Sequence, residues 1–368
     1  MKLLIATPLY PPQPGGPATY TRLLEQGLPA MGHEVGVLKF SDVARYPKIV
    51  RHALYFYRVF RAARGADLVL ALDAVSTGLP AAFATLLAKR PFVVRIPGDH
   101  AWEQGKQRFD IQENLDDFVR TGRVPFFVAV MRAAQNFVAH HARLVIVPSH
   151  YLKGIVMAWG IPEGKIIVIH NAVTEPVPGA VPEAIEALGR PRIVTSARLV
   201  PWKGVHGLID AVAMLRTSFP NASLAVVGDG PDRVQLETYA RTRLGENYAF
   251  TGGLPHEEAF AALTKADAFV LNSSYEGLSH VLIEALYAGV PIVASQAGGN
   301  GEVVIDGESG LLVPVGDTDA LVGALERIGS DKDLRARLVA GARARTQEFA
   351  LSTMLERTAA VLSGTLAA

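Results

Sequence analysis

The chain has 368 residues, of which 49% are apolar, with 36 basic and 35 acidic side chains and no cysteine. This length suits two domains of about 150 to 180 residues better than a single core. The balanced charge gives no reason to propose nucleic acid as a partner, and the lack of cysteine excludes disulfides, thiolate metal sites and a cysteine nucleophile.

The first twelve residues, MKLLIATPLYPP, contain an apolar run that is too short for the hydrophobic region of a signal peptide. We therefore expect a first buried strand there. Nowhere does the sequence approach about 18 uninterrupted apolar residues, the length that a membrane-spanning helix needs. These features predict a soluble, cytoplasmic protein.

Short apolar runs alternate with longer helical patterns, which predicts parallel strands joined by crossover helices. The expected strands are residues 3–6, 34–40, 68–72, 92–96, 144–147 and 166–169 in the first half, and 192–196, 224–227, 248–251, 268–271 and 291–295 in the second. A proline-rich linker with one short helix is expected between them, at 172–191. The fold class is therefore α/β, with two Rossmann-like doubly wound sheets whose ligands bind in a cleft between the domains.

The loop at residues 11–16, PPQPGG, follows the first strand and precedes a helix expected at 18–31. Its paired glycines, Gly15 and Gly16, would let backbone amides approach a ligand. A plain tight turn explains the same residues equally well.

Residues 46–64 combine basic and aromatic side chains, namely Lys48, Arg51, Arg58, Arg61 and Arg64 with Tyr55, Phe56, Tyr57 and Phe60. A basic, aromatic helix can lie on an anionic membrane surface. The alternative is a crossover helix with a basic outer face.

In the second half, Arg198 and Lys203 follow the strand at 192–196 and precede the next helix. Alone, such cations are usually surface charges. The glycines at 228–230 lack the third glycine of a dinucleotide fingerprint, so we expect a structural turn with Pro231 at the first helical position. The Asp-x-Asp pairs at 317–319 and 331–333 each precede a helix and fit caps, so the sequence indicates no metal site.

Residues 272–291, NSSYEGLSHVLIEALYAGVP, run from a strand through a small polar loop into a helix. Such a junction presents unpaired N–H groups and the positive end of the helix dipole, which favours phosphate. Gly277 would let a ligand approach the backbone, and Ser279 is a candidate N-cap. Two carboxylates, Glu276 in the loop and Glu284 in the helix, lie on either side of the junction.

Apolar neighbours surround Glu284 in the sequence, so we expect it to be partly buried and to need donors such as sugar hydroxyls. Two plainer interpretations remain. Glu284 would pair with a basic residue elsewhere, and Glu276 would be a solvated loop charge.

The two glutamates, the glycine-containing turn between them and the following AL-x-AG-x-P resemble the signature of retaining GT-B glycosyltransferases of family 4. Arg198 and Lys203 match the family's cation pair. The resemblance covers nearly the whole chain and is strongest over residues 192–315. It implies a retaining transfer of a hexosyl unit from a nucleotide-diphosphate sugar to a hydroxyl acceptor, without a metal or other cofactor.

The resemblance also implies roles for individual residues. Arg198, Lys203 and Glu276 would be catalytic, the two cations holding the diphosphate and the glutamate contacting hydroxyls of the donor sugar. Glu284 would hold the ribose, and the loop with Gly15 and Gly16 would touch the sugar or phosphate. The other donor-binding positions are the residues around the phosphates, namely Gly277, Leu278, Ser279, His280 and Val281.

One segment departs from the family pattern. Members often carry a His-Gly pair after the strand at 92–96, with the histidine close to the reacting sugar, whereas this chain has Pro97-Gly98-Asp99-His100. Asp99 or His100 would then contact the sugar or the acceptor. Asp73, at the end of the preceding strand, is a further candidate on the acceptor side.

Three segments follow from the resemblance: an acceptor-side Rossmann-like domain at 1–173, a nucleotide-sugar domain at 174–346, and a helix at 347–368 that crosses back to the first domain. The partners would be the donor and a glycan, lipid or small-molecule acceptor, with possible contact between 46–64 and the inner face of an anionic membrane. The alternatives are an epimerase or phosphorylase of the same architecture, or a non-catalytic nucleotide-sugar binder.

Overall fold

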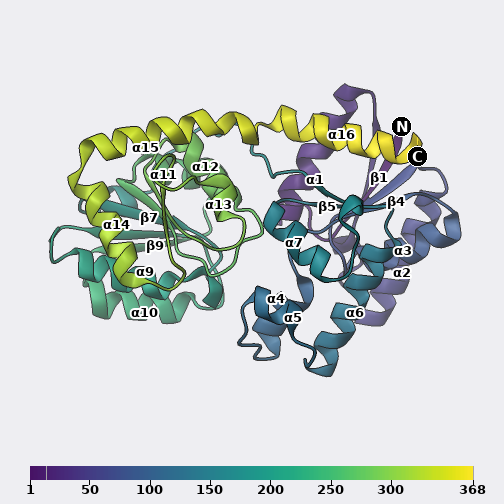
Figure 1. Ribbon diagram of the computed structural model, residues 1–368, viewed down its shortest axis with the longest axis horizontal. Helices are drawn as coiled ribbons and strands as arrows, with labels where there is room; N and C mark the ends of the chain where they lie inside the picture. The colour runs from purple at the N-terminus through teal and green to yellow at the C-terminus, as the bar shows by residue number, and fades with distance from the viewer. Residues whose placement is uncertain (14, 368) are drawn as a thin grey trace. The chain divides into compact units, whose positions relative to one another are not determined.

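The computed structural model describes residues 1–13 and 15–367, and so leaves out Pro14 of the 11–16 loop and the last residue of the predicted C-terminal helix. The chain divides into two units (Figure 1). Unit 1 comprises Met1–Asn171 together with Leu351–Ala368, and unit 2 comprises Ala172–Ala350. The sequence predicts these divisions at 173/174 and 346/347.

Unit 1 contains a six-stranded parallel sheet in the order β2-β1-β3-β4-β5-β6. Its strands are β1 (Lys2–Thr7), β2 (Glu34–Lys39), β3 (Leu68–Ala71), β4 (Phe92–Arg95), β5 (Leu144–Val147) and β6 (Ile166–Val168). The helices around it are α1 (Gly16–Gly27), α2 (Lys48–Ala63), α3 (Gly78–Ala88), α4 (His100–Arg108), α5 (Leu115–Arg120), α6 (Phe126–His141), α7 (His150–Ala158) and α16 (Leu351–Ala367).

Unit 2 contains a second six-stranded parallel sheet, in the order β12-β11-β10-β7-β8-β9. Its strands are β7 (Arg192–Ser196), β8 (Ser223–Val227), β9 (Tyr248–Gly252), β10 (Ala268–Leu271), β11 (Ile292–Ser295) and β12 (Leu311–Val313). The helices are α8 (Glu183–Glu186), α9 (Val205–Leu215), α10 (Arg233–Leu244), α11 (His256–Thr264), α12 (His280–Ala288), α13 (Asn300–Val303), α14 (Thr318–Ser330) and α15 (Lys332–Arg345), with a 3-10 turn η4 (Pro201–Lys203).

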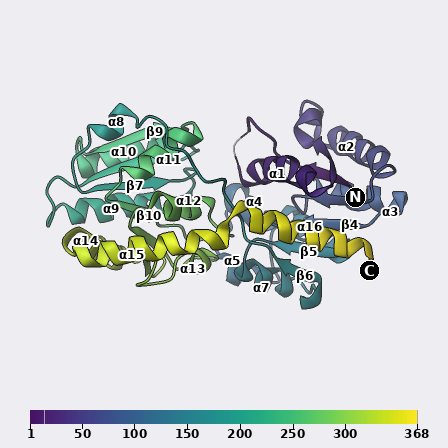
Figure 2. The same cartoon turned by 90° about the horizontal axis from the view of Figure 1, so that it is seen from above.

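Each strand of unit 2 contributes alternate side chains to two cores, because successive residues of a strand point to opposite faces. Ile193 packs with α9, α10 and α14, whereas its neighbour Val194 packs with α11 and α12. Figure 1 shows α11 and α12 on one side of strands β7 and β9 and α9 and α10 on the other, and Figure 2 shows the same sheet from above. The apolar runs in the sequence therefore form strands that are buried on both faces, and the predicted pair of doubly wound sheets is confirmed.

In each sheet, one pair of neighbouring strands is not consecutive in the sequence. In unit 1 this switch point lies between β1 and β3, and in unit 2 it lies between β7 and β10. Loops at the carboxyl ends of such strands diverge and leave room for a ligand. The fold therefore places the loops after β7 and β10 at a binding position.

The C-terminal helix α16 belongs to unit 1, where it packs against α1. The hydroxyls of Tyr20 and Thr358 lie 3.4 Å apart in this contact, and Leu362 is fully buried. The chain enters and leaves unit 2 at adjacent points, because Val173 and Ala350 form a parallel β-bridge.

Two details differ from the sequence prediction. Strand β12 was not expected, because three apolar residues between Gly310 and Pro314 carry no periodicity. Helix α10 begins at Arg233 with Asp232 as its N-cap, so Pro231 precedes the helix instead of opening it. In the part of the chain that the structure describes, we find no helix with both the length and the apolar character needed to cross a membrane.

Candidate active site

The unit 2 switch point brings together the two loops that the sequence singled out. Strand β7 leads into η4, which carries Lys203, and the adjacent strand β10 leads into the loop that carries Glu276. The Lys203 Nζ and the Glu276 Oε1 lie 2.6 Å apart, with only 19% and 9% of the two side chains exposed. Glu276 is therefore a nearly buried, paired carboxylate, and its interpretation as a solvated loop charge is wrong.

A third side chain completes this arrangement. The Ser273 hydroxyl is fully buried and donates to the same Glu276 oxygen, Oε1, at 2.7 Å. A carboxylate removed from water needs such donors. Both contacts engage Oε1, so the orientation of the Glu276 carboxylate is fixed by two groups from two strand-end loops.

The η4 turn is held against the β10 loop by backbone contacts. Ser274 donates its N–H to the carbonyl of Trp202 at 2.7 Å, and the Asn272 side chain donates to the carbonyl of Gly204 at 3.0 Å. Gly204 has φ 63°, and a Cβ there would lie 2.0 Å from the Asn272 oxygen. Only glycine fits this position, and the close approach sets the place of Lys203.

The other side of the Glu276 loop is held by the segment after β11. Gly299 donates its N–H to the Glu276 carbonyl at 3.0 Å, and a Cβ on Gly298 would lie 2.0 Å from the same oxygen. Asn300 donates to the Ser295 carbonyl at 3.0 Å. The loop at 298–302, which includes α13, is thus held by hydrogen bonds to its neighbours and supports the Glu276 loop.

Arg198 lies on the same strand-end loop as Lys203, but its side chain is exposed. Its backbone is fixed by the loop after β8, because Leu199 donates to the Asp229 carbonyl at 2.9 Å. Cβ atoms on Gly228 and Gly230 would lie within 2.2 Å of the Ala197 and Leu199 oxygens. These glycines therefore allow the two loops to pack closely behind Arg198. This agrees with the structural turn that the sequence predicts at 228–230.

Helix α12 opens beside this pair. Ser279 is its N-cap, and the Ser279 hydroxyl accepts the Leu282 N–H at 3.3 Å, as predicted. Leu278 and Ser279 are buried, whereas Gly277, His280 and Val281 are half-buried. The remaining N–H groups of the first turn and the helix dipole make this end favourable for an anion.

Glu284 lies one turn further along α12 and is partly buried, as predicted, with 17% of its side chain exposed. It also has a basic partner, because the His256 Nε2 lies 3.1 Å from its Oε1. That hydrogen bond raises the pKa of His256 above its usual range, while burial opposes the shift. The plainer interpretation, a basic partner for Glu284, therefore holds in the form of this hydrogen bond to His256.

In unit 1, Gly15 and Gly16 lie at the β1 side of the switch point. Gly15 is the N-cap of α1 with φ 139°, a backbone conformation that favours glycine, and it accepts the Ala18 N–H at 3.0 Å. A Cβ on Gly15 would lie 3.0 Å from the Leu9 side chain. The strand, turn and helix order expected here is present.

The three acceptor-side candidates have different surroundings. Asp99 is 1% exposed and accepts the Trp102 N–H at 2.9 Å as the N-cap of α4, while burial raises the pKa of its carboxyl. Asp73 accepts from the backbone of residues 76–78 at the start of α3. Only His100 among the three is half-buried and not engaged in a cap, and burial lowers its pKa.

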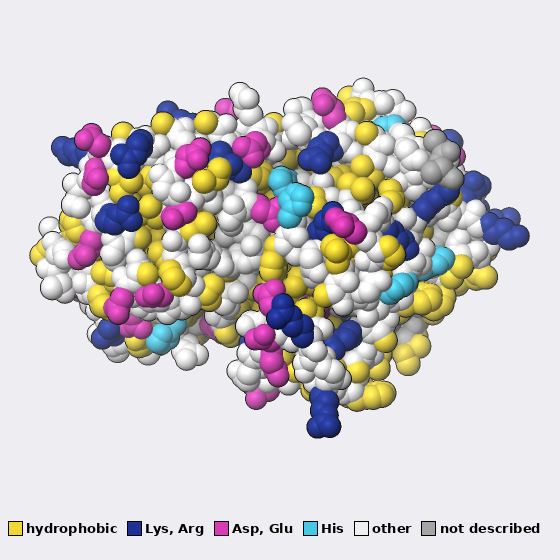
Figure 3. Space-filling model, in the orientation of Figure 1, with side chains coloured by type: hydrophobic (Ala, Val, Ile, Leu, Met, Phe, Trp, Pro, Cys, Tyr) yellow, Lys and Arg dark blue, Asp and Glu magenta, His cyan; other side chains and the backbone are white. Residues whose placement is uncertain are grey.

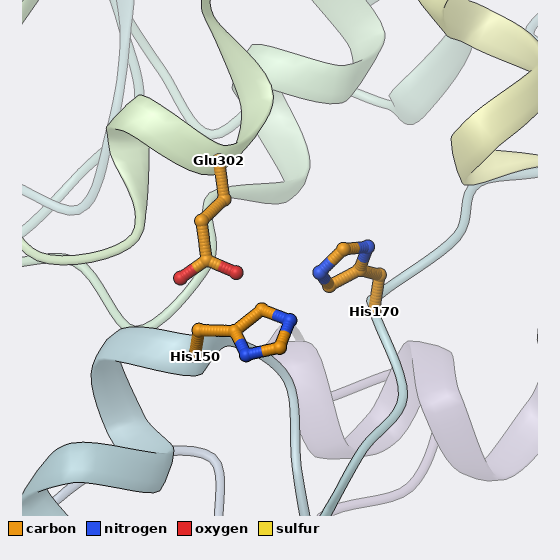
Figure 4. Close-up of side chains that lie close together, drawn as sticks. All are labelled: His150, His170 and Glu302. Carbon is orange, nitrogen blue, oxygen red and sulfur yellow. The ribbon is translucent and has the colours of Figure 1, made fainter.

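Figure 4 shows three further polar side chains: His150 at the start of α7, His170 after β6, and Glu302 on α13 of the other unit. The rings of His150 and His170 lie edge to face with centroids 6.3 Å apart. The Glu302 carbonyl accepts from Arg345 at 2.8 Å. Neither histidine was a candidate from the sequence, since isolated histidines carry no spacing signal.

The two Asp-x-Asp pairs are helix caps, as predicted. Asp317 accepts the Ala320 N–H at 2.8 Å and Asp331 accepts the Leu334 N–H at 2.8 Å. Sequence reasoning missed Ser273, Asn272 and Trp202, the residues that join the two loops. Small polar residues directly after a buried strand are the signal that points to the first two.

Two doubly wound parallel sheets, with a cation, a buried carboxylate and a helix N-terminus at the second switch point, are the arrangement expected of a GT-B glycosyltransferase. The family model described as Glycosyltransferase Family 4 matches residues 14–175, and the one described as Glycosyl transferases group 1 matches residues 181–345. Together the two models extend over almost the entire sequence. The chain belongs to this family of GT-B glycosyltransferases.

Among curated relatives, a GDP-mannose-dependent alpha-(1-6)-phosphatidylinositol monomannoside mannosyltransferase of Mycolicibacterium smegmatis is 37% identical over 187 residues, which is 48% of each chain. A glycogen synthase of Mycobacterium tuberculosis is 37% identical over 175 residues, 47% of this chain and 42% of the relative. The match therefore spans about half the length of these relatives.

Solved structures support the fold over the full length. The HepE protein of Anabaena, solved in complex with UDP, has a TM-score of 0.76 at 23% identity, with 99% of this chain and 100% of that chain covered. Sucrose-phosphate synthase of Thermosynechococcus elongatus has a TM-score of 0.79 at 20% identity, with coverage of 100% and 99%. The family match does not favour the epimerase, phosphorylase or binder alternatives.

Proposed function

We propose that the protein transfers a hexosyl unit from a nucleotide-diphosphate sugar to a hydroxyl acceptor, with retention of configuration and without a metal ion. The observation that carries this proposal is the Lys203–Glu276 pair at the unit 2 switch point, beside the N-terminus of α12. A cation and a set of N–H groups suit a diphosphate, and a fixed carboxylate suits sugar hydroxyls.

In the proposed reaction, the bond between the sugar anomeric carbon and the phosphate oxygen breaks while the acceptor oxygen bonds to the same carbon. Negative charge develops on the leaving diphosphate. Lys203 and Arg198, together with the N–H groups around Leu278 to Val281, would stabilise that charge. The leaving phosphate would take the acceptor proton on the same face of the sugar, which gives retention.

Glu276 would orient the donor sugar. Lys203 and Ser273 both contact its Oε1, so we assign Oε2 to the sugar hydroxyls. Glu284 would accept from the ribose hydroxyls, displacing or sharing His256. Apart from Gly15 and Gly16 of unit 1, the donor-binding groups in this arrangement belong to unit 2.

The acceptor side is assigned to unit 1. Gly15 and Gly16 would approach the sugar or phosphate through their backbone, and His100 is a better candidate than the buried Asp99 for contact with the sugar or acceptor. The acceptor would be a glycan, a lipid-linked sugar or a small molecule. Cytoplasmic location, with peripheral contact with the inner membrane face, completes the proposal.

A thermal-shift screen over UDP, GDP, ADP and dTDP sugars tests donor binding, because a ligand that prefers the folded state raises the melting temperature. We expect the sugars of one base to raise the melting temperature of the wild type. Lys203→Met or Arg198→Met should lose most of that increase. The matched controls are Lys265→Met and Arg337→Gln, two exposed cations of unit 2 outside the site.

Turnover is then followed with labelled donor in the presence of EDTA. We expect transfer to persist with the chelator and Glu276→Gln to lower kcat by roughly 100-fold. Donor affinity without any product would establish the binder alternative, and a changed sugar on the released nucleotide would establish the epimerase. Loss of activity with EDTA that returns with a divalent ion would contradict metal independence.

A further inference from the structure

A large apolar surface lies on unit 1, away from the residues assigned above. Helix α3 contains no charged residue, yet Phe83, Leu86 and Leu87 point to solvent, with Leu87 67% exposed. At the start of α6, Phe126 and Phe127 are 75% and 64% exposed. A helix that is apolar on all sides is normally covered, and large exposed patches mark interaction sites.

A groove crosses this surface where α2 packs on α3 and α3 packs on α6. Its volume is about 580 Å³, within the range of about 300 to 1,000 Å³ that holds organic ligands. Apart from His52, the described residues that line it are apolar, and they include Phe56, Phe83, Leu86 and Met131. Such a lining offers almost no hydrogen bonds, so it suits a hydrocarbon chain and not a sugar or nucleotide.

Positive charge borders the same surface. The helices α2, α3 and α6 contain no aspartate or glutamate, whereas α2 carries Arg51, Arg58 and Arg61 and ends at Arg64. Arg58 and Arg61 are exposed, Arg58 lies 3.9 Å from the Asp42 carboxylate, and Arg90 follows α3. Figure 3 shows hydrophobic side chains gathered with Lys and Arg on the edge of unit 1 where these helices lie.

We propose that this α2–α3–α6 face docks on an anionic lipid bilayer and that the hydrocarbon chain of a membrane lipid enters the groove. Exposed aromatic and aliphatic side chains would enter the acyl region, and the arginines would meet the lipid phosphates. The idea that the docked lipid carries the acceptor of the transferred sugar rests on the proposed function. Membrane binding itself needs no donor.

The structure shows that only part of α2 is available to contact a membrane. Tyr55, Val59 and Ala63 are fully buried against the sheet, and the Tyr55 hydroxyl donates to the Leu38 carbonyl at 2.8 Å. Helix α2 is therefore a crossover helix that supplies one groove wall and a basic rim. The apolar part of the docking surface lies mainly on α3 and α6, while α2 adds Phe56 to the groove lining and the exposed Ile49.

Charge distinguishes the bilayer from a second copy of the chain. Two copies docked through this face would bring the arginines of both α2 helices together without a carboxylate from α2, α3 or α6 to pair with them. Like charges across an interface oppose association. An anionic surface provides the missing counter-charges.

The test is co-sedimentation of the full chain, without donor, with vesicles of equal parts phosphatidylglycerol and phosphatidylcholine, and with vesicles of phosphatidylcholine alone. We expect binding to the anionic vesicles that weakens with salt. Leu87→Glu and Phe126→Glu should each weaken it about tenfold or more, and Arg61→Gln about fivefold. The controls Val234→Glu and Arg337→Gln, at exposed positions of unit 2, should leave it unchanged.

Because the chain has no cysteine, Leu87→Cys gives a single site for a bimane label, and brominated acyl chains should quench it in anionic vesicles. A label on Val234→Cys should not be quenched. Absence of vesicle binding, or binding that Leu87→Glu leaves intact, overturns the proposal. Self-association that Leu87→Glu abolishes, without vesicle binding, assigns the face to a second copy. These readings are independent of the donor screen, so either proposal can fail alone.

Discussion

Lys203 and Glu276 neutralise each other at 2.6 Å while largely shielded from water. Removing one member of such a pair leaves a charge without its partner. We expect Lys203→Met to lower the free energy of unfolding by about 1 to 3 kcal/mol, since Ser273 alone then satisfies Glu276. The double variant Lys203→Met/Glu276→Gln should recover part of this loss. Urea denaturation of the wild type, Lys203→Met, Glu276→Gln and the double variant measures the coupling energy between the two side chains. Additive effects of the two single changes would contradict the prediction.

His256 gives the second prediction at this scale. Its pKa is raised by Glu284, so the protonated ring contributes stability fully below the ordinary pKa of 6.5, and this is lost as pH rises through the higher folded value. Because the ring is half exposed, we expect only about 0.5 kcal/mol. Melting curves between about pH 5.5 and 8.5 should show this step in the wild type. Both His256→Asn and Glu284→Gln should lack it.

At the level of elements, the positions of the strand-end loops depend on glycines that touch neighbouring backbone. Gly298 has φ 52° and would place a Cβ 2.0 Å from the Glu276 carbonyl oxygen. We expect Gly298→Ala to cost about 2 kcal/mol or more in urea denaturation and to weaken donor binding through displacement of the Glu276 loop. Gly307→Ala is the matched control, since Gly307 also has positive φ but open space around it. Equal effects of both changes would show that backbone strain alone is responsible.

The sequence was sufficient to predict the strands whose apolar runs are buried on both faces, such as 144–147, 192–196 and 268–271. It also placed the Ser279 cap and singled out the loops after β7 and β10, whereas the pairing of those two strands came from the structure. It could not show that Lys203 pairs with Glu276 or that His256 reaches Glu284, since those contacts join distant segments. The apolar surface on α3 was hidden as well, because its run resembles a core helix.

For the whole molecule, the division of unit 1 into two chain segments has a measurable effect. Helix α16 covers α1, and Leu355 lies so close to Gly27 that a Cβ there would meet it at 2.3 Å. We expect deletion of 351–368 to expose α1 and to destabilise unit 1 by several kcal/mol, about 2 kcal/mol for each large apolar side chain lost. Hydrogen exchange should rise in β1 and α1 while β7 and β10 stay protected. Uniform loss of protection would mean that the units unfold together.

The β-bridge between Val173 and Ala350 means that unit 2 starts and finishes at neighbouring points. During synthesis all of residues 172–350 are made before α16, although the sheet of unit 1 is made first. Domains usually mature in the order of their translation. The later unit can therefore reach its native state while the earlier one lacks its last helix. Chains that end at Ala350 and stay attached to the ribosome through a linker long enough to clear the exit tunnel should already bind nucleotide but remain sensitive to proteases around α1.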